Sequence, residues 1–328
     1  MTGTILVTGG AGYIGSHALL ELLARGFKPV VLDDLSTGSR AAVPAGVELQ
    51  VGDVGDEAFL EKVLTNHRPV GVMHFAGSIV VEESVRDPLK YYNNNTAKTL
   101  SLLNAWIRHG GGPFIFSSTA AVYGAPPVQP VTEGAAKTPM SPYGASKWMS
   151  EVAIHDAALA HPEFRPVCLR YFNVAGADPQ GRTGQRGPQS THLIRVAVET
   201  ALGQRERLQV FGVDYDTRDG SCERDFIHVS DLAAAHVAAL DYLLAGGSPA
   251  VFNCGYGRGY TVLEVVAALE HILGRSLPVT RAGRRPGDIP RLVSDSTSLR
   301  RELNWTPRYD DLGLILRSAL SWQSNLAR

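Results

Sequence analysis

The chain has 328 residues, of which 44% are hydrophobic and 19% are charged, a length sufficient for two domains with a large core. Its 31 basic and 32 acidic side chains leave a formal net charge of −1, so no long-range field favours nucleic acid or an anionic membrane surface as a partner. Any anionic ligand must therefore be held by local groups.

Short β-branched segments alternate with helical patterns through the first half of the chain. In chain order, the expected strands span residues 4–8, 29–33, 47–51, 71–75, 113–117 and 167–172. Between them apolar residues recur at spacings of three and four, and the expected helices span residues 14–25, 57–66, 89–109 and 143–160. This alternation predicts an α/β fold, a doubly wound parallel sheet of the Rossmann type with helices on both faces.

The second half of the chain has a different texture. Residues 176–189 are rich in Gly, Pro, Asp and Arg, and helices and short strands follow to residue 328. We therefore expect a smaller C-terminal α/β domain, formed by residues 174–224 and 254–328. The sheet domain is expected to comprise residues 1–173 together with elements near 225–253 that return to it.

A glycine-rich turn follows the first expected strand. Gly9, Gly12 and Gly15 stand between that strand and a helical pattern, where backbone amides and a helix N-terminus can approach a pyrophosphate. A tight turn without a ligand would also contain glycine, but the strand and the helix that the binding motif requires are both present. The segment therefore predicts a dinucleotide-binding site.

Residues at the ends of later strands extend this site. The second strand ends in Asp33 and Asp34, where a carboxylate can accept hydrogen bonds from an adenosine ribose and repel a 2′-phosphate, which favours NAD over NADP. Asp53 follows the third strand and either meets the exocyclic amine of adenine or is a solvated loop residue. The Phe-Ala-Gly segment 75–77 either passes beneath the cofactor or is a plain strand end.

Tyr143 and Lys147 stand four residues apart at the start of an expected helix, so they share one helix face. A tyrosine with its ordinary pKa of about 10 is a poor base at neutral pH. A neighbouring ammonium group and a positive nicotinamide ring stabilise the phenolate and so lower that pKa. The pair therefore suits the oxidation of an alcohol, and the Thr119 hydroxyl can relay a proton. Without the glycine turn, the same residues indicate only a helix surface and a turn.

Several motifs together resemble the extended short-chain dehydrogenase/reductase family. They occupy residues 8–15, 75–77, 117–124, 143–147, 170–173, 224–229 and 284–288, so the resemblance covers essentially the whole chain. Within the family, the motifs are most similar to those of the members that epimerise UDP-galactose at C4. The resemblance implies a tightly held NAD that is reduced and reoxidised in each turnover, with Tyr143 as the base, Lys147 tuning it and Thr119 assisting.

The resemblance also implies which residues contact the two ligands. The expected NAD-binding residues are Gly9, Gly12, Tyr13, Ile14, Gly15, Asp33, Asp34, Ser36, Thr37, Gly38, Asp53, Val54, Phe75, Ala76, Gly77, Asn95, Ser117, Tyr143, Lys147 and Phe172. The expected UDP-sugar-binding residues are Ser78, Thr119, Tyr143, Asn173, His192, Leu193, Gln209, Phe211, Arg224, Arg285, Asp288 and Leu292. No metal is expected, because the histidines show no metal-ligand spacing.

Some positions depart from the family's pattern. The best-known members carry a Lys after Phe-Ala-Gly where this chain has Ile79, and a Ser where it has Thr119. Thr191 and His192 replace paired Asn residues near the diphosphate. The acidic residues that eliminating relatives carry after the Ser/Thr cluster are two alanines here, at 120–121. Elimination needs a positioned acid and base, so a dehydratase is disfavoured.

The implied reaction is therefore the C4 epimerisation of UDP-hexoses, through transient oxidation to a 4-keto sugar. UDP-N-acetylhexosamines and UDP-pentoses stay open as substrates, because Leu292 is of intermediate size where the family discriminates the C2 substituent. The sequence also leaves open a dehydratase, a dehydrogenase and a non-catalytic NAD-binding protein. The presence of both Tyr143 and Lys147 argues against a non-catalytic protein.

The remaining expectations concern partners and location. The segments 89–109 and 143–160 match those through which such enzymes pair, which implies a homodimer. Three widely spaced cysteines, Cys168, Cys222 and Cys254, form neither a disulfide framework nor a zinc motif and favour a reducing compartment. No apolar run approaches the roughly 18 residues of a membrane span. We therefore expect a cytoplasmic protein that binds a UDP-sugar, with neither nucleic acid nor membrane as a partner.

Overall fold

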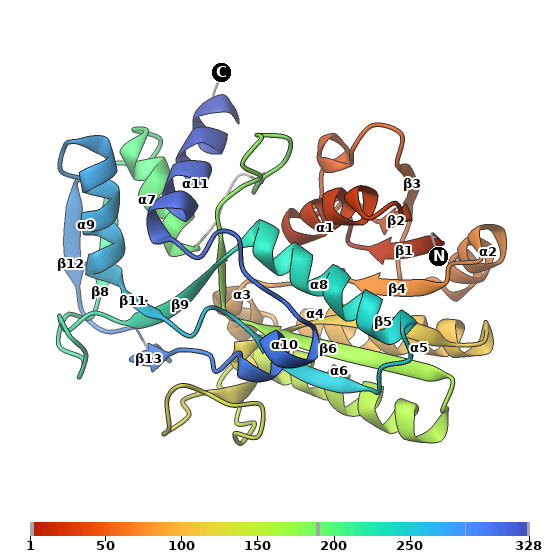
Figure 1. Ribbon diagram of the computed structural model, residues 1–328. Coiled ribbons are helices and arrows are strands. Elements are labelled where there is room, and N and C mark those ends of the chain that lie inside the picture. Colours follow the sequence, from red (N-terminus) through yellow and green to blue (C-terminus); the bar gives the residue numbers. More distant parts are fainter. Residues whose placement is uncertain (1–2, 188–190, 286, 327–328) are drawn as a thin grey trace.

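The centre of the molecule is one parallel sheet (Figure 1). The computed structural model describes residues 3–187, 191–285 and 287–326, so Pro286 of the expected nucleotide-binding segment lies outside the described residues. Seven strands lie in the order β10-β6-β5-β4-β1-β2-β3, and all neighbouring pairs are parallel. They are β1 (Thr4–Thr8), β2 (Lys28–Asp33), β3 (Glu48–Val51), β4 (Gly71–His74), β5 (Gly112–Thr119), β6 (Phe164–Tyr171) and β10 (Ala250–Cys254). The order reverses between β1 and β4, where a ligand crevice forms at the carboxyl ends of such sheets.

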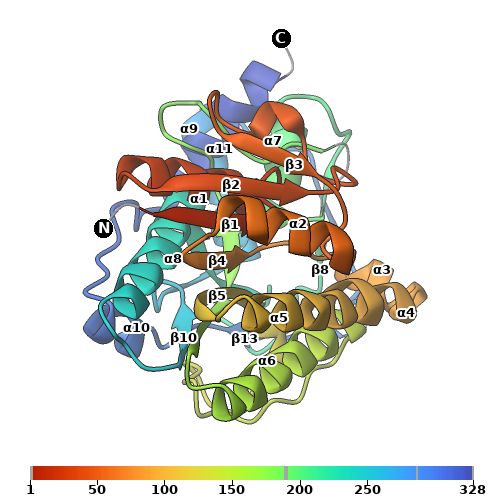
Figure 2. The ribbon, with the colours of Figure 1, turned by 90° about the vertical axis from the view of Figure 1, so that its right-hand side faces the viewer.

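Helices cover both faces of this sheet, which confirms the doubly wound arrangement expected from the sequence (Figure 2). On one face, α1 (Tyr13–Ala24) packs beside α8 (Val229–Leu244). The other face is covered by α2 (Glu57–His67), α5 (Lys98–Arg108) and α6 (Pro142–Ala160).

The strands are apolar on both sides because both faces are covered. Leu6 and Val7 are neighbours on β1 and point to opposite faces. Val7 belongs to the core cluster that contains Leu19 of α1, and Leu6 belongs to the cluster that contains Leu60 of α2. A continuous hydrophobic run such as β1 is therefore typical of a buried parallel strand.

One helix differs from the sequence expectation. The pattern predicts a single helix over residues 89–109, but the chain forms α4 (Pro88–Tyr91), the π-helical turn η2 (Tyr92–Ala97) and α5 in succession. Asn95 lies in this wider turn and is fully buried. A search for a period of 3.6 residues does not detect a π-helical turn, and such turns occur frequently at functional sites.

The second part of the chain builds two small sheets beside the carboxyl ends of the main strands (Figure 1). One sheet has the order β11-β9-β13, with β7 paired to β9, and the other is β12-β8. The strands of these two sheets are β7 (Asn173–Ala175), β8 (Leu208–Phe211), β9 (Glu223–His228), β11 (Gly259–Thr261), β12 (Val279–Ala282) and β13 (Arg291–Leu292). The helices of this part are α7 (Leu193–Ala201), α9 (Val262–Leu273), α10 (Thr297–Glu302) and α11 (Leu312–Leu326).

The two parts are interleaved and share one core. β10 pairs with β6 of the main sheet, whereas β9, which overlaps the start of the expected returning segment near 225–253, belongs to the four-stranded sheet of the second part. One hydrophobic cluster runs from Ile5 on β1 to Leu316 on α11. Among the described helices there is none with the length and apolar character that crossing a bilayer demands.

Candidate active site

The glycine turn between β1 and α1 lies against the end of β4. Gly9 has a φ of +70°, and a Cβ atom there would lie 2.5 Å from the backbone nitrogen of Ala76. A Cβ atom at Gly15 would lie 2.3 Å from the carbonyl oxygen of Gly9. Glycine is therefore required at both positions for the strand, the turn and the helix to approach so closely.

The first turn of α1 is open to an anion. Among the described residues no side chain caps α1 at Gly12, and no acidic residue stands in its first turn. The first N–H groups of a helix have no partner within it, and the helix dipole adds partial positive charge. This cradle of glycine backbone and free amides fits the pyrophosphate of NAD.

Asp33 is fixed beside the glycine turn. Its carboxylate accepts hydrogen bonds from the backbone N–H groups of Ala11 (3.0 Å) and Leu35 (2.9 Å). Burial raises the pKa of this carboxyl. A Cβ atom at Gly38 would lie 2.8 Å from Asp33 Oδ1, so the loop that contains Thr37 and Gly38 closes over it. The geometry therefore fits a ribose diol and opposes a 2′-phosphate.

Several other residues expected at the nucleotide are engaged within the protein. Asp34 accepts hydrogen bonds from the N–H (2.9 Å) and the hydroxyl (2.6 Å) of Ser36. Asp53 forms an ion pair with Lys98 (2.7 Å), so an adenine amine would share its carboxylate with that cation. Val54 is buried in the core beneath α2.

Tyr13 and Ile14 begin α1 and face the second part of the chain. The Tyr13 hydroxyl donates a hydrogen bond to the carbonyl oxygen of Gly176 (2.6 Å). Ile14 packs against the cluster that the two parts share. Tyr13 therefore ties the glycine turn to the loop after β7.

Asn95 holds the segment after β4 beside α6. Its Oδ1 accepts from the Ser78 N–H (2.7 Å), and its Nδ2 donates to the Ser78 carbonyl (3.0 Å) and to the Ser146 hydroxyl (3.0 Å). A Cβ atom at Gly77 would lie 3.4 Å from Lys147 Nζ. Phe75, Ala76 and Gly77 thus lead directly past the Lys147 ammonium, while the Ile79 side chain is 52% exposed.

Tyr143, Lys147 and Thr119 lie together at the carboxyl end of β5. The Ser141 hydroxyl caps α6 by accepting from the Gly144 N–H (3.2 Å), which places Tyr143 in the first turn. Tyr143 is 7% exposed and forms a side-chain hydrogen bond with Thr119. Lys147, one turn later and 3% exposed, donates from Nζ to the carbonyl oxygen of Ser117 (3.0 Å).

Desolvation is the largest cause of the pKa shifts in this group. Burial raises the pKa of Tyr143 above its ordinary value, although the hydrogen bond with Thr119 acts in the opposite direction. Burial also lowers the pKa of Lys147 to about 8. The lowering of the Tyr143 pKa that is expected from Lys147 and the nicotinamide ring together concerns the NAD-loaded site and stays a prediction. The sequence argument weighed the attraction between the two charges but not the desolvation of each group.

A buried ion pair lies behind these residues, and sequence reasoning does not identify it. Glu151 Oε2 lies 2.5 Å from Arg170 Nη2, and both side chains are 3% exposed. The Ser118 hydroxyl donates to the same carboxylate. One signal was available, because Glu151 continues the four-residue spacing of Tyr143 and Lys147 and so places a charge on the buried face of α6.

The expected UDP-sugar residues are contributed by several elements of the second part. Asn173 begins β7, His192 precedes α7 and Leu193 begins it, Gln209 and Phe211 lie on β8, Arg224 on β9 and Leu292 on β13. Arg285 and Asp288 lie in the loop before β13.

Two subsets of these residues come together. The Arg285 guanidinium lies 4.5 Å from the centre of the Phe211 ring and forms two hydrogen bonds of 3.1 Å with Asp288. Arg224 and Leu292 are paired in the β9–β13 register. The side chains of Asn173 and Gln209 form neither a hydrogen bond nor an ion pair within the described part of the chain.

Leu292 connects the second part to the catalytic residues. It is 7% exposed and packs in one cluster with Phe172, Tyr123 and Ala120. Ala120 directly follows Thr119, so the Leu292 side chain belongs to a wall that continues from the end of β5.

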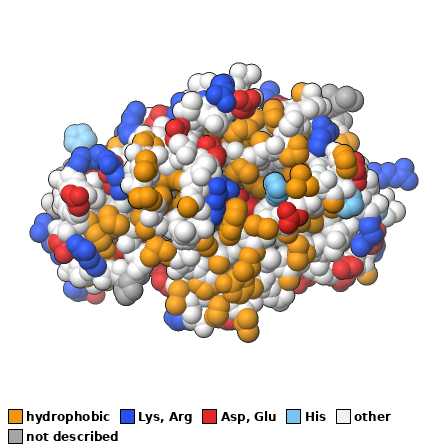
Figure 3. Space-filling model, turned by 90° about the horizontal axis from the view of Figure 1, so that it is seen from below, with side chains coloured by type: hydrophobic (Ala, Val, Ile, Leu, Met, Phe, Trp, Pro, Cys, Tyr) orange, Lys and Arg blue, Asp and Glu red, His pale blue; other side chains and the backbone are white. Residues whose placement is uncertain are grey.

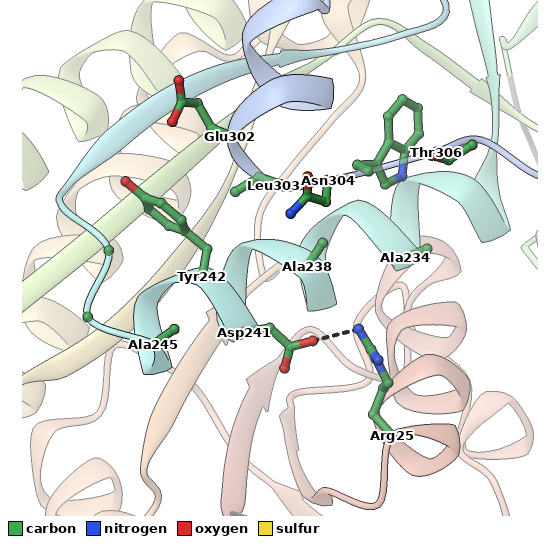
Figure 4. Close-up of a pocket in the computed structure, with 13 residues that line it drawn as sticks. Arg25, Ala234, Ala238, Asp241, Tyr242, Ala245, Glu302, Leu303, Asn304 and Thr306 are labelled. Atoms are coloured by element: carbon green, nitrogen blue, oxygen red, sulfur yellow. Dashed lines mark hydrogen bonds and ion pairs between the residues drawn. The ribbon is translucent and has the colours of Figure 1, made fainter.

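A surface groove of about 770 Å³ lies elsewhere, between the end of α8 and the segment after α10 (Figure 4). Arg25 and Asp241 form an ion pair of 2.7 Å at its edge, and Tyr242 and Trp305 also line it. It contains none of the residues expected at the nucleotide or the sugar. The crevice at the ends of β1, β4 and β5 is therefore the candidate active site.

Comparison with known proteins identifies the family of the chain. Residues 5–255 match the model of the NAD dependent epimerase/dehydratase family. A UDP-glucose 4-epimerase of Azospirillum brasilense is 56% identical over 322 residues, which are 98% of this chain and 92% of the relative. The crystal structure of UDP-glucose 4-epimerase from Brucella ovis in complex with NAD has a TM-score of 0.94 at 43% identity, with 98% of each chain covered. The UDP-Glc/GlcNAc 4-epimerase of Campylobacter jejuni has a TM-score of 0.87 at 46% identity, with 98% of this chain and 99% of that chain covered. Because the family model matches most of the chain and these relatives match nearly all of it, the chain belongs to the NAD dependent epimerase/dehydratase family.

Proposed function

We propose that this protein is an NAD-dependent isomerase that converts UDP-galactose to UDP-glucose by epimerisation at C4. The observation that carries the proposal is the buried group of Thr119, Tyr143 and Lys147 at the end of β5, next to a glycine cradle that fits NAD. The similarity to UDP-glucose 4-epimerases along nearly the whole chain supports the same conclusion.

The glycine turn at Gly9 and Gly15 would hold NAD, which would supply an acceptor and then a donor of hydride for C4 of the sugar. Tyr143 takes the proton of the C4 hydroxyl and later gives it back, so the reaction consumes no external acid or base. The Thr119 hydroxyl, whose interaction with Tyr143 acts to lower the pKa of the phenol, is proposed to pass a proton or a hydrogen bond between the sugar and Tyr143. Lys147 donates to the Ser117 carbonyl, which fixes the ammonium beneath the segment 75–77.

The second part of the chain is proposed to hold UDP. Arg224 and Arg285 supply the cations for the diphosphate, since a guanidinium group binds phosphate oxygens in a bidentate manner. Residues 174–224 and 254–328 thus form the substrate-binding domain of the proposal, and residues 1–173, with the returning elements near 225–253, form the NAD-binding domain.

UDP-N-acetylhexosamines are the second candidate substrates. Leu292 lies in the wall beside the catalytic residues and lacks both the ring and the hydroxyl of a tyrosine. The 46% identical protein of Campylobacter jejuni is named a UDP-Glc/GlcNAc 4-epimerase. We propose that plain hexoses are preferred and that N-acetylated ones react more slowly.

We also propose a homodimer formed through α5 and α6. Met149, Val152 and Leu159 recur at three- and seven-residue spacing on α6 and are 49%, 40% and 73% exposed. Leu100 of α5 is 41% exposed. Figure 3 views the side on which α6 lies in Figure 1, and hydrophobic side chains gather there. Apolar surface of this kind typically marks a protein interface.

A cytoplasmic location is part of the same proposal. Cys168, Cys222 and Cys254 are all free and buried, which suits a reducing compartment.

The test is to incubate the purified protein with UDP-galactose and to separate the products. Formation of UDP-glucose without added cofactor, together with transient near-ultraviolet absorbance of reduced nicotinamide, is the expected result. Stable accumulation of a 4-keto or dehydrated sugar would instead indicate the dehydrogenase or the dehydratase.

A further inference from the structure

Arg285 is held between two carboxylates from different parts of the chain. Its Nε and Nη2 bond to Asp288 of its own loop (3.1 Å each), and its Nη1 lies 3.5 Å from Oε1 of Glu82. Glu82 belongs to α3 (Val81–Arg86), which follows the segment 75–78 of the NAD-binding part. The ion pair of Glu82 and Arg285 therefore joins the NAD-binding part of the chain to the loop before β13.

Glu82 faces a second residue expected at the diphosphate. Crowding by protein atoms lowers the pKa of the His192 imidazole, and the negative charge of Glu82 acts in the opposite direction. Glu82 thus lies within electrostatic reach of both His192 and Arg285. Its side chain is 50% exposed and Arg285 is 44% exposed, so water and ligands can reach the pair.

The position of α3 is fixed by Tyr91 rather than by the ion pair. The Tyr91 hydroxyl accepts from the Val80 N–H (3.0 Å) and lies 2.8 Å from Glu83 Oε2. The Tyr91 ring meets the Tyr143 ring edge-on, with centres 6.4 Å apart. Glu82 is therefore carried on a helix that is anchored to the catalytic group, and removal of its charge does not remove that anchor.

We infer that Glu82 is a residue that competes with the substrate diphosphate for Arg285 and so sets the affinity for UDP. This inference rests on the proposed function, because it takes the diphosphate to be the ligand of Arg285. A diphosphate must displace the Glu82 carboxylate from the guanidinium group and then lie beside a like charge. Glu82 therefore weakens the binding of UDP and of UDP-sugars, and its ion pair with Arg285 forms again when the nucleotide dissociates.

The experiment measures the dissociation constants of UDP and of uridine by calorimetry on the NAD-loaded protein. An exposed ion pair contributes little, so Glu82→Gln is expected to tighten UDP binding by about fivefold. Uridine has no phosphate, and its binding is expected to be unchanged. The difference in UDP affinity between the two proteins should shrink at high salt, because the groups are exposed. Glu206→Gln removes the same charge from a 79% exposed side chain and is the matched control, with UDP affinity equal to that of the wild type.

A double-variant cycle separates the inference from the proposed function. If Arg285→Ala weakens UDP binding and Glu82→Gln has no further effect in that background, the competition is supported. If Arg285→Ala weakens UDP binding but Glu82→Gln alone leaves it unchanged, the competition is overturned and the proposed substrate class stands. If Arg285→Ala leaves UDP binding unchanged, Arg285 is not a diphosphate ligand, and both its assignment and the competition are wrong.

Discussion

At the scale of single residues, burial decides the chemistry of the crevice. Tyr143 and Lys147 are almost completely shielded from solvent. Burial raises the pKa of Tyr143 and lowers the pKa of Lys147, so it favours the neutral form of each side chain. Thr119 is the group whose hydrogen bond opposes this effect on the phenol. Tyr143 is therefore a base whose proton affinity depends strongly on what is bound beside it.

Tyr143→Phe tests this role directly. The substitution removes the phenol oxygen and keeps the ring against Tyr91, so NAD content and UDP affinity should stay near those of the wild type. Turnover of UDP-galactose should fall by at least about a hundredfold, the usual contribution of a positioned base. Tyr260→Phe, far along the chain in β11, is the matched control and should retain activity. Turnover of Tyr143→Phe within a factor of about three of the wild type would contradict the assignment.

Leu292 determines the second prediction at this scale. A hydrophobic wall discriminates by about 1–3 kcal/mol, or roughly 10 to 200-fold in kcat/KM. Leu292→Tyr should suppress the reaction of UDP-N-acetylhexosamines and spare that of the plain UDP-hexoses. Leu292→Ser should instead favour the reaction of UDP-N-acetylhexosamines relative to that of the plain UDP-hexoses. The measurement is kcat/KM for both substrate pairs in all three proteins. An unchanged ratio across the series means that another wall sets the specificity.

The choice between cofactors depends on Asp33. Its fixed carboxylate would face a 2′-phosphate, so NADP should restore activity to cofactor-stripped protein much less well than NAD. Asp33→Asn should narrow the difference. Equal restoration by NAD and NADP in the wild type would contradict this expectation.

At the scale of elements, α6 serves both the crevice and the surface. Tyr143, Lys147 and Glu151 lie on its buried face, while Met149 and Leu159 are exposed. The buried charge on this face is stabilised by Arg170 of β6. One helix therefore connects the catalytic group with the surface proposed to form the dimer.

Leu159→Asp tests the dimer. A carboxylate at this 73% exposed position should be tolerated in the monomer and should oppose burial at an interface. The mass measured by light scattering should fall from that of a dimer to that of a monomer. Leu23→Asp, on α1 at the opposite face of the sheet and 41% exposed, is the control and should leave the mass unchanged. A wild-type protein that is already monomeric at micromolar concentration would refute the proposal.

The parts of the fold that sequence predicted are those determined by local pattern. Periodicity and β-branched segments were sufficient for β1 and for α1, because each buries a face that its own residues define. The π-helical turn around Asn95 was missed, because its hydrogen bonds to Ser78 and Ser146 join residues from three separate segments. The Glu151 and Arg170 pair was missed for the same reason.

At the scale of the whole molecule, buried histidines set the response to acid. Burial lowers the pKa values of His17 and His236 to about 4 and those of His74 and His228 to about 3. Below the ordinary histidine pKa of about 6.5, the unfolded chain binds protons that the folded chain does not. Stability from these groups is complete above that pH and is lost as the pH falls toward 4.

The free energy of unfolding should therefore decrease between pH 7 and pH 5. The limiting slope is about 1.4 kcal/mol per pH unit for each buried neutral histidine. His236→Gln should reduce the limiting slope by the contribution of one histidine, about 1.4 kcal/mol per pH unit. His155→Gln, at a side chain that is 71% exposed, should leave the slope unchanged. Denaturant unfolding at a series of pH values is the measurement, and a flat profile would contradict the expectation.

The edge strand β10 has a consequence for synthesis of the protein. It pairs with β6 but is separated from it in sequence by β7, α7, β8, β9 and α8. While the chain is being made, the β6 edge stays unpaired until residues 250–254 leave the ribosome, and an unpaired edge can pair with another chain. Nascent chains that end between β6 and β10 should therefore depend on chaperones.

A protease cut in the loop at residues 181–187 should leave two fragments that stay associated, because each contains strands of the same sheet.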